Sequence, residues 1–348
     1  TRRSLSLACI GFACVFGLFF SSDQEIKRNN AFQRKYSPHG LEELGNFPLE
    51  SNSFYIAGMD DSIIYLGNYY APLYLKAIDI YSKTSKDIKI EIENYELPYK
   101  RVRIEVNPPY FFIGDGTIPI LFRGKISDWQ AKTFSHSDAH FYQFAAIDST
   151  SIVLSTTSSK TKMNVLGILQ NDQDKTTFNL NSKILKKQSS GTFDTDGILL
   201  WNNQHQYMLY VYYYRNQFEI TNKQLQFQYT GKTIDTIKQA QINVDYYQKD
   251  AQYKIGKAIV VNRHASTYGN LLYINSDHLG KYEDGEILKS ASIIDQYQFT
   301  NNTYAQSFYF YHQPYKKIDD FKVFRDYIFG LVDDKLWIYQ IKPEYNQN

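Results

Sequence analysis

The chain has 348 residues, 38 of them Lys or Arg and 36 Asp or Glu, so its formal net charge is only +2. Basic and acidic residues interleave without a basic stripe, and we therefore expect no nucleic-acid partner, because such partners need a clustered positive face. Both cysteines, Cys9 and Cys14, precede residue 21, which excludes a disulfide framework, a thiolate nucleophile and a cysteine-ligated metal from the rest of the chain.

The first 22 residues have the layout of an export segment. Arg2 and Arg3 come before an apolar run from Leu5 to Phe20, and polar sequence follows. This order predicts a signal peptide or a membrane anchor over residues 1–22, and an exported protein of the periplasm or cell envelope. The small-residue cleavage pattern is poor around Phe19, and the run is slightly short for a span of ~20 residues. Both cleavage and retention in the inner membrane by residues 5–20 therefore stay open.

The polar segment 23–53 contains Pro38, Gly40, Gly45 and Pro48. Proline and glycine at this density interrupt regular structure. We therefore expect a tether and lead-in segment before the first sheet, with the main domain over residues 54–348.

From residue 54 onward, strand–turn–strand patterns recur, and Tyr, Phe, Ile and Val in these strands favour half-buried β-structure. The six connections are Asp60-Asp61, Gly114-Asp115-Gly116, Asp148-Ser149, Asn202–His205, a longer loop over 262–269, and Asp333-Asp334. Repeats of about 50 residues with several strands each are typical of β-propellers, because one small sheet buries its faces only against neighbouring sheets. We predict an all-β fold, a six-bladed β-propeller behind an N-terminal hydrophobic helix, with seven blades or a β-sandwich as alternatives.

Two stretches near the ends of the chain repeat one pattern. Tyr-Ile-x-Gly followed by Asp-Asp occurs within Tyr55–Leu66 and again within Asp326–Ile341. We predict equivalent hairpins in neighbouring blades that close the ring. We interpret both aspartate pairs as turns, because Asp bonds nearby backbone amides and tolerates left-handed backbone. Cation binding by the paired carboxylates is the alternative.

The sequences "NNAFQRKYSPHG", "FYIAGMDDSIIYLGN" and "YIFGLVDDKLWIYQIK" resemble a group of bacterial six-bladed β-propeller proteins of the cell envelope. The resemblance is strongest in the first and last blades, and Asp-Asp is absent from the second to fifth hairpins. It implies a fold and an envelope location more than an activity. Some members of the group are associated with membrane redox proteins.

The sequence "HSDAH" contains the sharpest cluster of potential metal ligands. If this stretch is extended, His136, Asp138 and His140 alternate onto one face. Two imidazoles and a carboxylate form a ligand set for iron or zinc. The alternative is a solvated loop between the second and third units.

Three further residues are candidates for ligand binding. Arg263 and His264 fall in the long loop of the fifth unit, and His205 falls in a turn. Loops at the mouth of a propeller can line a binding funnel. No base is paired with a nucleophile, so we assign no catalytic residue. P-loop, dinucleotide and haem motifs are absent from the sequence, and we predict no cofactor.

These patterns favour a non-catalytic scaffold that binds a protein or a ligand in the envelope. Its expected partner is an envelope or membrane protein, it could serve as an accessory subunit of a membrane complex, and an uncleaved N-terminal segment would contact the membrane. The alternative is a propeller enzyme, a hydrolase or lyase of sugars or lactones. The enzyme requires that at least two histidines converge, out of His136, His140, His205, His264 and His278.

Overall fold

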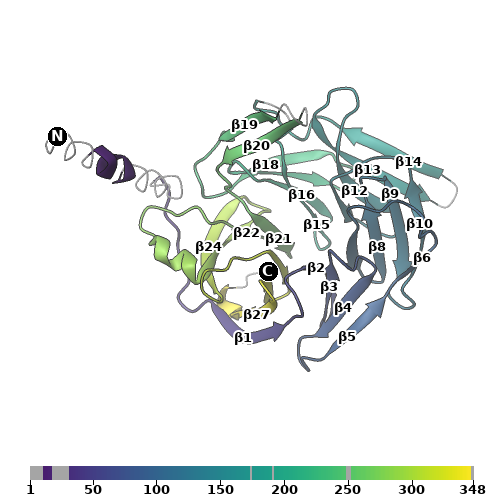
Figure 1. Cartoon of the computed structure of the whole chain (residues 1–348), viewed down its shortest axis with the longest axis horizontal. Helices are drawn as coiled ribbons and strands as arrows, with labels where there is room; N and C mark the ends of the chain where they lie inside the picture. The colour runs from purple at the N-terminus through teal and green to yellow at the C-terminus, as the bar shows by residue number, and fades with distance from the viewer. Residues whose placement is uncertain (1–10, 18–30, 173–174, 190–191, 248–251, 346–348) are drawn as a thin grey trace, which may run out of the picture.

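The computed structural model describes residues 11–17, 31–172, 175–189, 192–247 and 252–345. Strands dominate this part of the chain, and small sheets are arranged radially around a central axis (Figure 1). The prediction of an all-β propeller is therefore confirmed. Helical structure is restricted, among the described residues, to residues 11–17 and two short 3₁₀ turns, η1 (Gly285–Lys289) and η2 (Pro343–Tyr345).

The strands form six four-stranded antiparallel units, which we number in chain order. Units 1 to 3 consist of β2 (Phe54–Asp60), β3 (Ile63–Asn68), β4 (Tyr74–Asp79) and β5 (Ser85–Lys89); β7 (Arg103–Asn107), β8 (Tyr110–Asp115), β9 (Ile120–Lys125) and β10 (Gln130–His136); and β11 (Gln143–Ala146), β12 (Ser151–Thr157), β13 (Asn164–Asp172) and β14 (Lys175–Asn181). Units 4 to 6 consist of β15 (Gly197–Asn202), β16 (Tyr207–Tyr212), β17 (Gln217–Asn222) and β18 (Phe227–Lys232); β21 (His264–Tyr268), β22 (Leu271–Asn275), β23 (Ala291–Gln298) and β24 (Thr303–Tyr311); and β25 (Asp320–Phe324), β26 (Tyr327–Val332), β27 (Lys335–Ile341) and β1 (Leu41–Pro48). Two elements lie outside the units: the short β6 (Glu91–Ile92), and the hairpin of β19 (Ile242–Tyr247) and β20 (Gln252–Ala258).

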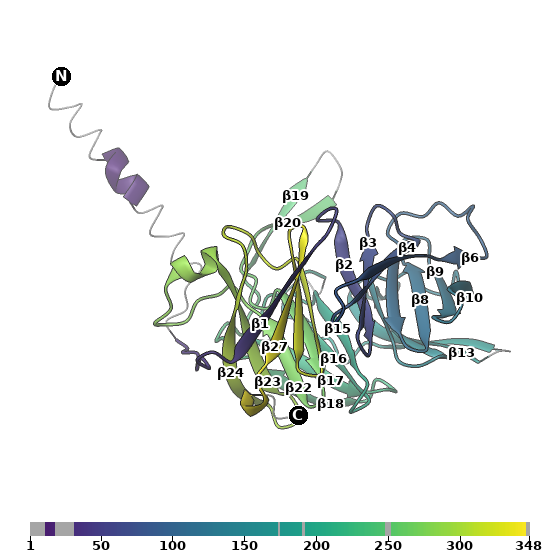
Figure 2. The same ribbon diagram turned by 90° about the horizontal axis from the view of Figure 1, so that it is seen from below.

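The innermost strands of the six units surround the central axis. Each contacts the next in the order β2, β7, β11, β15, β21 and β25, and β25 contacts β2 again. Because every unit has four antiparallel strands, the chain leaves each unit at the face where the next innermost strand begins. We call this the mouth face and the opposite one the base face. The β19–β20 hairpin projects from the mouth face, whereas the chain ends at the base face (Figure 2).

Burial follows the radial arrangement. The buried apolar side chains form six clusters, and each cluster fills the space between two neighbouring units. Between units 6 and 1, for example, Ile64 and Leu66 pack against Phe329 and Leu336, all fully buried. Burying one such side chain contributes roughly 1.5–3 kcal/mol. No unit has a core of its own, so the units are stable only as a ring.

The start of the chain completes the last unit. Strand β1 pairs antiparallel with β27 from Leu41 opposite Ile341 to Pro48 opposite Lys335, with a bulge before Gly45. The segment 23–53, expected as a tether and lead-in segment, thus contains a full strand of the ring. The Pro and Gly content concealed it, because Pro48 occupies the last position of an edge strand, where no ladder donor is needed.

The innermost strands have a free edge that faces the axis, and at five of the six junctions a side chain of the neighbouring unit bonds to that edge, whereas Asn202 bonds the β21–β22 turn. At five of the six junctions a side-chain oxygen accepts a backbone N–H, and at the other an amide side chain donates to a carbonyl. The bonds are Tyr55 Oη to Ile104 N (2.9 Å), Glu105 to Ala146 N (3.2 Å), Gln143 Oε1 to Leu199 N (2.9 Å), Asn202 Nδ2 to Gly269 O (2.9 Å), Ser266 Oγ to Val323 N (2.8 Å) and Asp320 Oδ2 to Ile56 N (2.9 Å). The ring is therefore joined by polar bonds as well as by apolar burial.

Units 1 and 2 are joined more closely than the others. Gly58 of β2 pairs with Val106 of β7 in a parallel bridge, so the two units share one nine-stranded sheet. A Cβ atom on Gly58 would lie 2.1 Å from the Val106 carbonyl oxygen, which explains why glycine occupies this position. Because of this shared sheet, the count of six separate blades stays a prediction.

Both aspartate pairs lie at turns, as expected. Asp61 and Asp333 have φ values of 45° and 55°, the left-handed region that Asp tolerates. The prediction of equivalent hairpins is wrong, however. Asp60-Asp61 connects the first and second strands of unit 1 at the base face, whereas Asp333-Asp334 connects the second and third strands of unit 6 at the mouth face. The two hairpins are neighbours through their shared core, but they are one strand out of phase.

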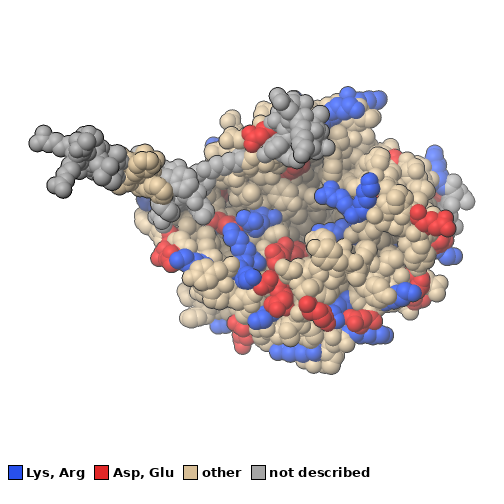
Figure 3. All heavy atoms as spheres, viewed as in Figure 1, with Lys and Arg blue, Asp and Glu red and all other residues tan. Residues whose placement is uncertain are grey.

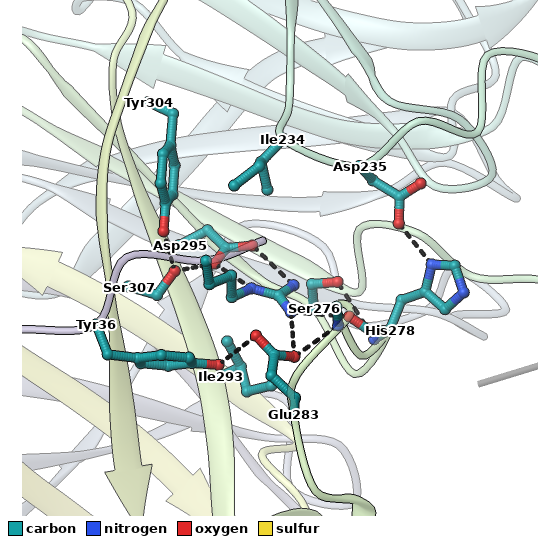
Figure 4. A network of polar contacts seen from close by, with 12 residues as sticks. Tyr36, Ile234, Asp235, Ser276, His278, Glu283, Ile293, Asp295, Tyr304 and Ser307 are labelled. Atoms are coloured by element: carbon teal, nitrogen blue, oxygen red, sulfur yellow. Dashed lines mark hydrogen bonds and ion pairs between the residues drawn. The ribbon is translucent and has the colours of Figure 1, made fainter. Parts of the chain in front are cut away.

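The segment before β1 is held on unit 5 by a buried arginine (Figure 4). The Arg34 guanidinium forms two hydrogen bonds to Asp295, at 2.7 and 3.1 Å, and one of 2.8 Å to Glu283. Tyr36 Oη also donates to Glu283, at 2.9 Å. The backbone of Tyr36 forms a parallel bridge with Ser307 on the edge of β24. This cluster ties the start of the chain to unit 5 while β1 completes unit 6.

The expected signal peptide or anchor, residues 1–22, lies mostly outside the described residues. Within it, only residues 11–17 are described, and they are helical. No helix in the described part of the chain is long and apolar enough to cross a membrane. Retention by residues 5–20 stays a prediction, because most of that segment lies outside the described residues.

Replacing Arg34 should destabilise the ring strongly. Arg34→Met leaves the buried carboxylates of Asp295 and Glu283 without their cation, and breaking such a group costs about 3–5 kcal/mol. Lys35→Met removes the same charge from an exposed neighbour and should change stability by less than about 0.5 kcal/mol. Urea unfolding followed by tyrosine fluorescence would compare the two midpoints. Equal midpoints would show that the cluster adds nothing to stability.

Candidate functional site at the mouth of the channel

Charged side chains gather where the innermost strands begin. Arg103, His264 and Asp320 are the first residues of β7, β21 and β25, and Glu105 and Lys322 lie two positions further along β7 and β25. We call these five residues the channel cluster. The space-filling view of the mouth face shows a hollow at its centre, with charged side chains on its rim (Figure 3).

Electrostatic influence across the ring places this cluster at the axis. The charge of Arg103, from unit 2, acts on Asp320 of unit 6 and on Tyr213 of unit 4. Lys322 of unit 6 acts in turn on Glu105 of unit 2. Side chains from units that are not neighbours can influence one another in this way only across the central channel.

Glu105 is the most perturbed acid of the cluster. Burial raises the pKa of its carboxyl to about 7, although Lys322 and the Ala146 N–H favour the charged form. The carboxylate accepts that N–H with both oxygens at 3.2 Å. Near neutral pH, Glu105 is therefore present partly as the protonated acid and partly as the carboxylate.

His264 and Asp320 form a second titratable pair. Burial raises the pKa of Asp320, while its hydrogen bond from Ile56 N and the His264 imidazole oppose that shift. Burial likewise lowers the pKa of His264, against the attraction of Asp320. The low polarity of the channel wall thus disfavours charge on both groups.

Arg103 is held by aromatic rings. Its guanidinium carbon lies 4.1 Å from the ring centroid of Tyr55 and 4.4 Å from that of Tyr69, and the two centroids are 5.1 Å apart. The guanidinium therefore occupies the corner between the two rings and stays exposed on its other side. No ion pair within 4 Å involves Arg103 or Lys322 in the described part of the chain.

The three residues expected to bind a ligand do not come together. His264 lies in the channel cluster, and Arg263 beside it pairs with Asp277 at 3.0 Å. Both were expected in a long loop over 262–269. Instead, β21 begins at His264, directly after Arg263, and the turn that follows β21 contains only Gly269 and Asn270. His205 lies in the β15–β16 turn at the base face, where its ring stacks near Tyr207.

The expected metal ligands do not share a face. Ser137 has a φ of 67°, which breaks the extended run from His136 to His140 on which that interpretation depended. Asp138 accepts a hydrogen bond from Ser135 at 2.7 Å, and His140 Nδ1 lies 3.2 Å from the Gly116 carbonyl oxygen. In the described ranges, no group of three or more His, Cys, Asp or Glu is placed to hold a metal ion.

His278 is buried in the cluster around Arg34 and does not face the channel. Its Nδ1 lies 2.5 Å from Asp235, and its carbonyl oxygen accepts from Arg34 at 2.9 Å (Figure 4). The five histidines named from the sequence therefore lie in different surroundings, and only His264 belongs to the channel cluster.

Exposed tyrosines are concentrated on the mouth face. Nine tyrosines are exposed among the described residues, and only Tyr81 lies on the base face. The other eight are Tyr69, Tyr70, Tyr74, Tyr95, Tyr142, Tyr282, Tyr311 and Tyr315. The longer connections, including the β19–β20 hairpin, are on the same face. Exposed Tyr on long loops is typical of binding surfaces.

Comparisons with known proteins bear on the fold alone. No protein-family model and no curated protein matches the chain. A member of the DUF4221 family from Bacteroides vulgatus superposes with a TM-score of 0.55 at 12% identity, over 88% of this chain and 99% of that one. Virginiamycin B lyase from Staphylococcus aureus has a TM-score of 0.49 at 10% identity, over 87% and 99%. The β-propeller domain of Cps50 (Swd1) from Myceliophthora thermophila has 0.49 at 6%, over 87% and 100%.

Glu105 should make the protein less stable as pH rises. Its folded pKa of about 7 exceeds the unfolded value of ~4.3, so the folded state holds the proton longer. The free energy of unfolding should therefore fall between pH 5 and 8, by about 2 kcal/mol from this group after allowing for solvent screening. Glu105→Gln keeps an acceptor for Ala146 N and should remove that part of the slope. Urea unfolding across this pH range would test it, and identical slopes would refute the assignment.

Proposed function

We propose that this chain is an exported, six-bladed β-propeller that acts as a non-catalytic binding module for an envelope protein. The interface is the mouth face. The observation that carries the proposal is the concentration of exposed tyrosines there, eight against one on the base face. Tyrosine supplies large amphipathic contact area at low cost in conformational entropy, and it is enriched at protein interfaces.

The alternative, a propeller enzyme, has less support. It needs at least two histidines in one place, yet His264 is the sole histidine of the channel cluster and His205 lies on the other face. The channel acids with raised pKa, Glu105 and Asp320, each bond a backbone N–H of the neighbouring unit. Burial that serves ring closure is thus sufficient to explain their pKa shifts.

Site-directed photo-crosslinking in intact cells would test the proposed interface. A photoreactive phenylalanine analogue would replace Tyr70 or Tyr315, which are 90% and 78% exposed on the mouth face. The matched control is the same replacement at Tyr81, which is 68% exposed on the base face. We expect a discrete protein adduct from the two mouth positions and none from Tyr81.

Adducts of the same size from all three positions would contradict a mouth-face interface, and so would the absence of any adduct from Tyr70 and Tyr315. Mass spectrometry of the adduct would identify the partner. It would also separate a membrane complex from a different envelope protein.

A further inference from the structure

The channel cluster contains two acids and two cations, and only the acids bond a backbone N–H group at a junction between units. Glu105 bonds Ala146 N and Asp320 bonds Ile56 N, so both close junctions between units. Arg103 and Lys322 form no ion pair among the described residues, although several acids lie on the mouth face. A cation at a channel wall without an acidic partner is available for an anionic ligand.

Arg103 is also pre-positioned. Tyr55 and Tyr69 hold one side of its guanidinium, and Tyr55 is itself fixed because its hydroxyl accepts Ile104 N–H at 2.9 Å. The residue is otherwise exposed, at the start of β7 on the mouth face. A guanidinium with restricted motion loses less entropy on binding and presents its N–H groups as a fork.

The surroundings of Arg103 and Lys322 favour an anion more than a count of the nearby ionisable residues indicates. Burial raises the pKa of both Asp320, which Arg103 influences, and Glu105, which Lys322 influences, and so weakens the negative charge near the two cations. Burial lowers the pKa of His264, so this group adds little positive charge of its own. Lys322 supplies a second cation deeper in the channel, on the side of Glu105.

We propose that the mouth of the channel binds an oxyanion with paired oxygens, a carboxylate or a phosphate group, on Arg103, with Lys322 as the second cation. The site takes the anionic group of a small ligand or of a segment inserted from a partner. This anion site depends on the proposed function only because both are on the mouth face. Arginine forms bidentate hydrogen bonds to both kinds of oxyanion, so the two sources share one chemistry.

Titration of the purified full chain would test this site, with sodium succinate in one series and inorganic phosphate in another. Isothermal calorimetry at pH 6.5 and low salt should show one saturable site, because screening weakens exposed charge pairs. Arg103→Gln should weaken binding at least tenfold. Arg101→Gln is the matched control, since Arg101 is an exposed arginine two residues earlier that contacts no ring among the described residues, and it should change affinity less than twofold.

Arg103→Lys keeps the charge without the planar fork, and should bind more weakly than the wild type but more tightly than Arg103→Gln. This graded order cannot arise from unfolding, which the melting temperature of each variant would monitor. Tighter binding of succinate would identify a carboxylate ligand, and tighter binding of phosphate a phosphorylated one. The affinity for succinate, which is already largely ionised at pH 6, should also fall between pH 6 and 8, as Glu105 becomes charged beside Lys322.

Saturable binding that Arg103→Gln and Arg101→Gln reduce equally would overturn the proposal, because it would reflect overall charge. No saturable binding of either anion would also overturn it. The protein-binding function would survive that result, since crosslinks from Tyr70 and Tyr315 do not depend on Arg103. Conversely, anion binding without crosslinks would contradict the protein-binding function and would identify the chain as a receptor for a small anionic ligand.

Discussion

The free edges of the six innermost strands are the constraint on which the rest of the structure depends. A strand that faces the axis has backbone N–H groups that the strand on its other side cannot satisfy, and buried N–H groups need partners. The chain supplies them from side chains of the neighbouring unit, among them Glu105 and Asp320. Polar and ionisable residues are therefore required at the channel wall before any ligand is considered. Polar side chains at the channel wall that bond a backbone group are therefore distinguished from those that remain available for a ligand.

That separation changes how the perturbed groups are interpreted. A carboxyl with a pKa near 7 in a channel is a common sign of acid–base chemistry. In this ring, the same burial that closes the junction at Ala146 produces the shift of Glu105. Arg103 bonds no backbone group at a junction, although it packs against two tyrosine rings of unit 1. Its lack of an acidic partner makes Arg103 more informative about ligand binding than the residues with large pKa shifts.

The sequence predicted the class of fold well and the phase of the repeat poorly. Recurrent turns, such as Asp148-Ser149 between β11 and β12, indicated strands and a radial architecture, because turn chemistry is local. The turn expected at Gly114-Asp115-Gly116 lies further along, at 116–119, because Gly114 and Asp115 belong to β8. The assignment of strands to units depends on contacts between distant segments, and identical Asp-Asp turns at Asp61 and Asp333 concealed a shift of one strand. Strand β1 was missed for the same reason, since its partner β27 lies near the other end of the chain. In the site, His264 was found through its neighbours in "NRHAS", whereas Arg103 and Lys322 belong to no motif and become visible only when units 2 and 6 face each other.

The pairing of Leu41 with Ile341 also sets the order of events during synthesis. Strand β1 leaves the ribosome well before its partner β27, so the ring has to remain open until β27 has been made. Contacts of such long sequence separation close slowly, because loop-closure entropy is lost before the contact gains anything. The ion pairs of Arg34 with Glu283 and Asp295 likewise form only after unit 5 has been made. Residues 34–48 thus reach their places late in folding although they are made early.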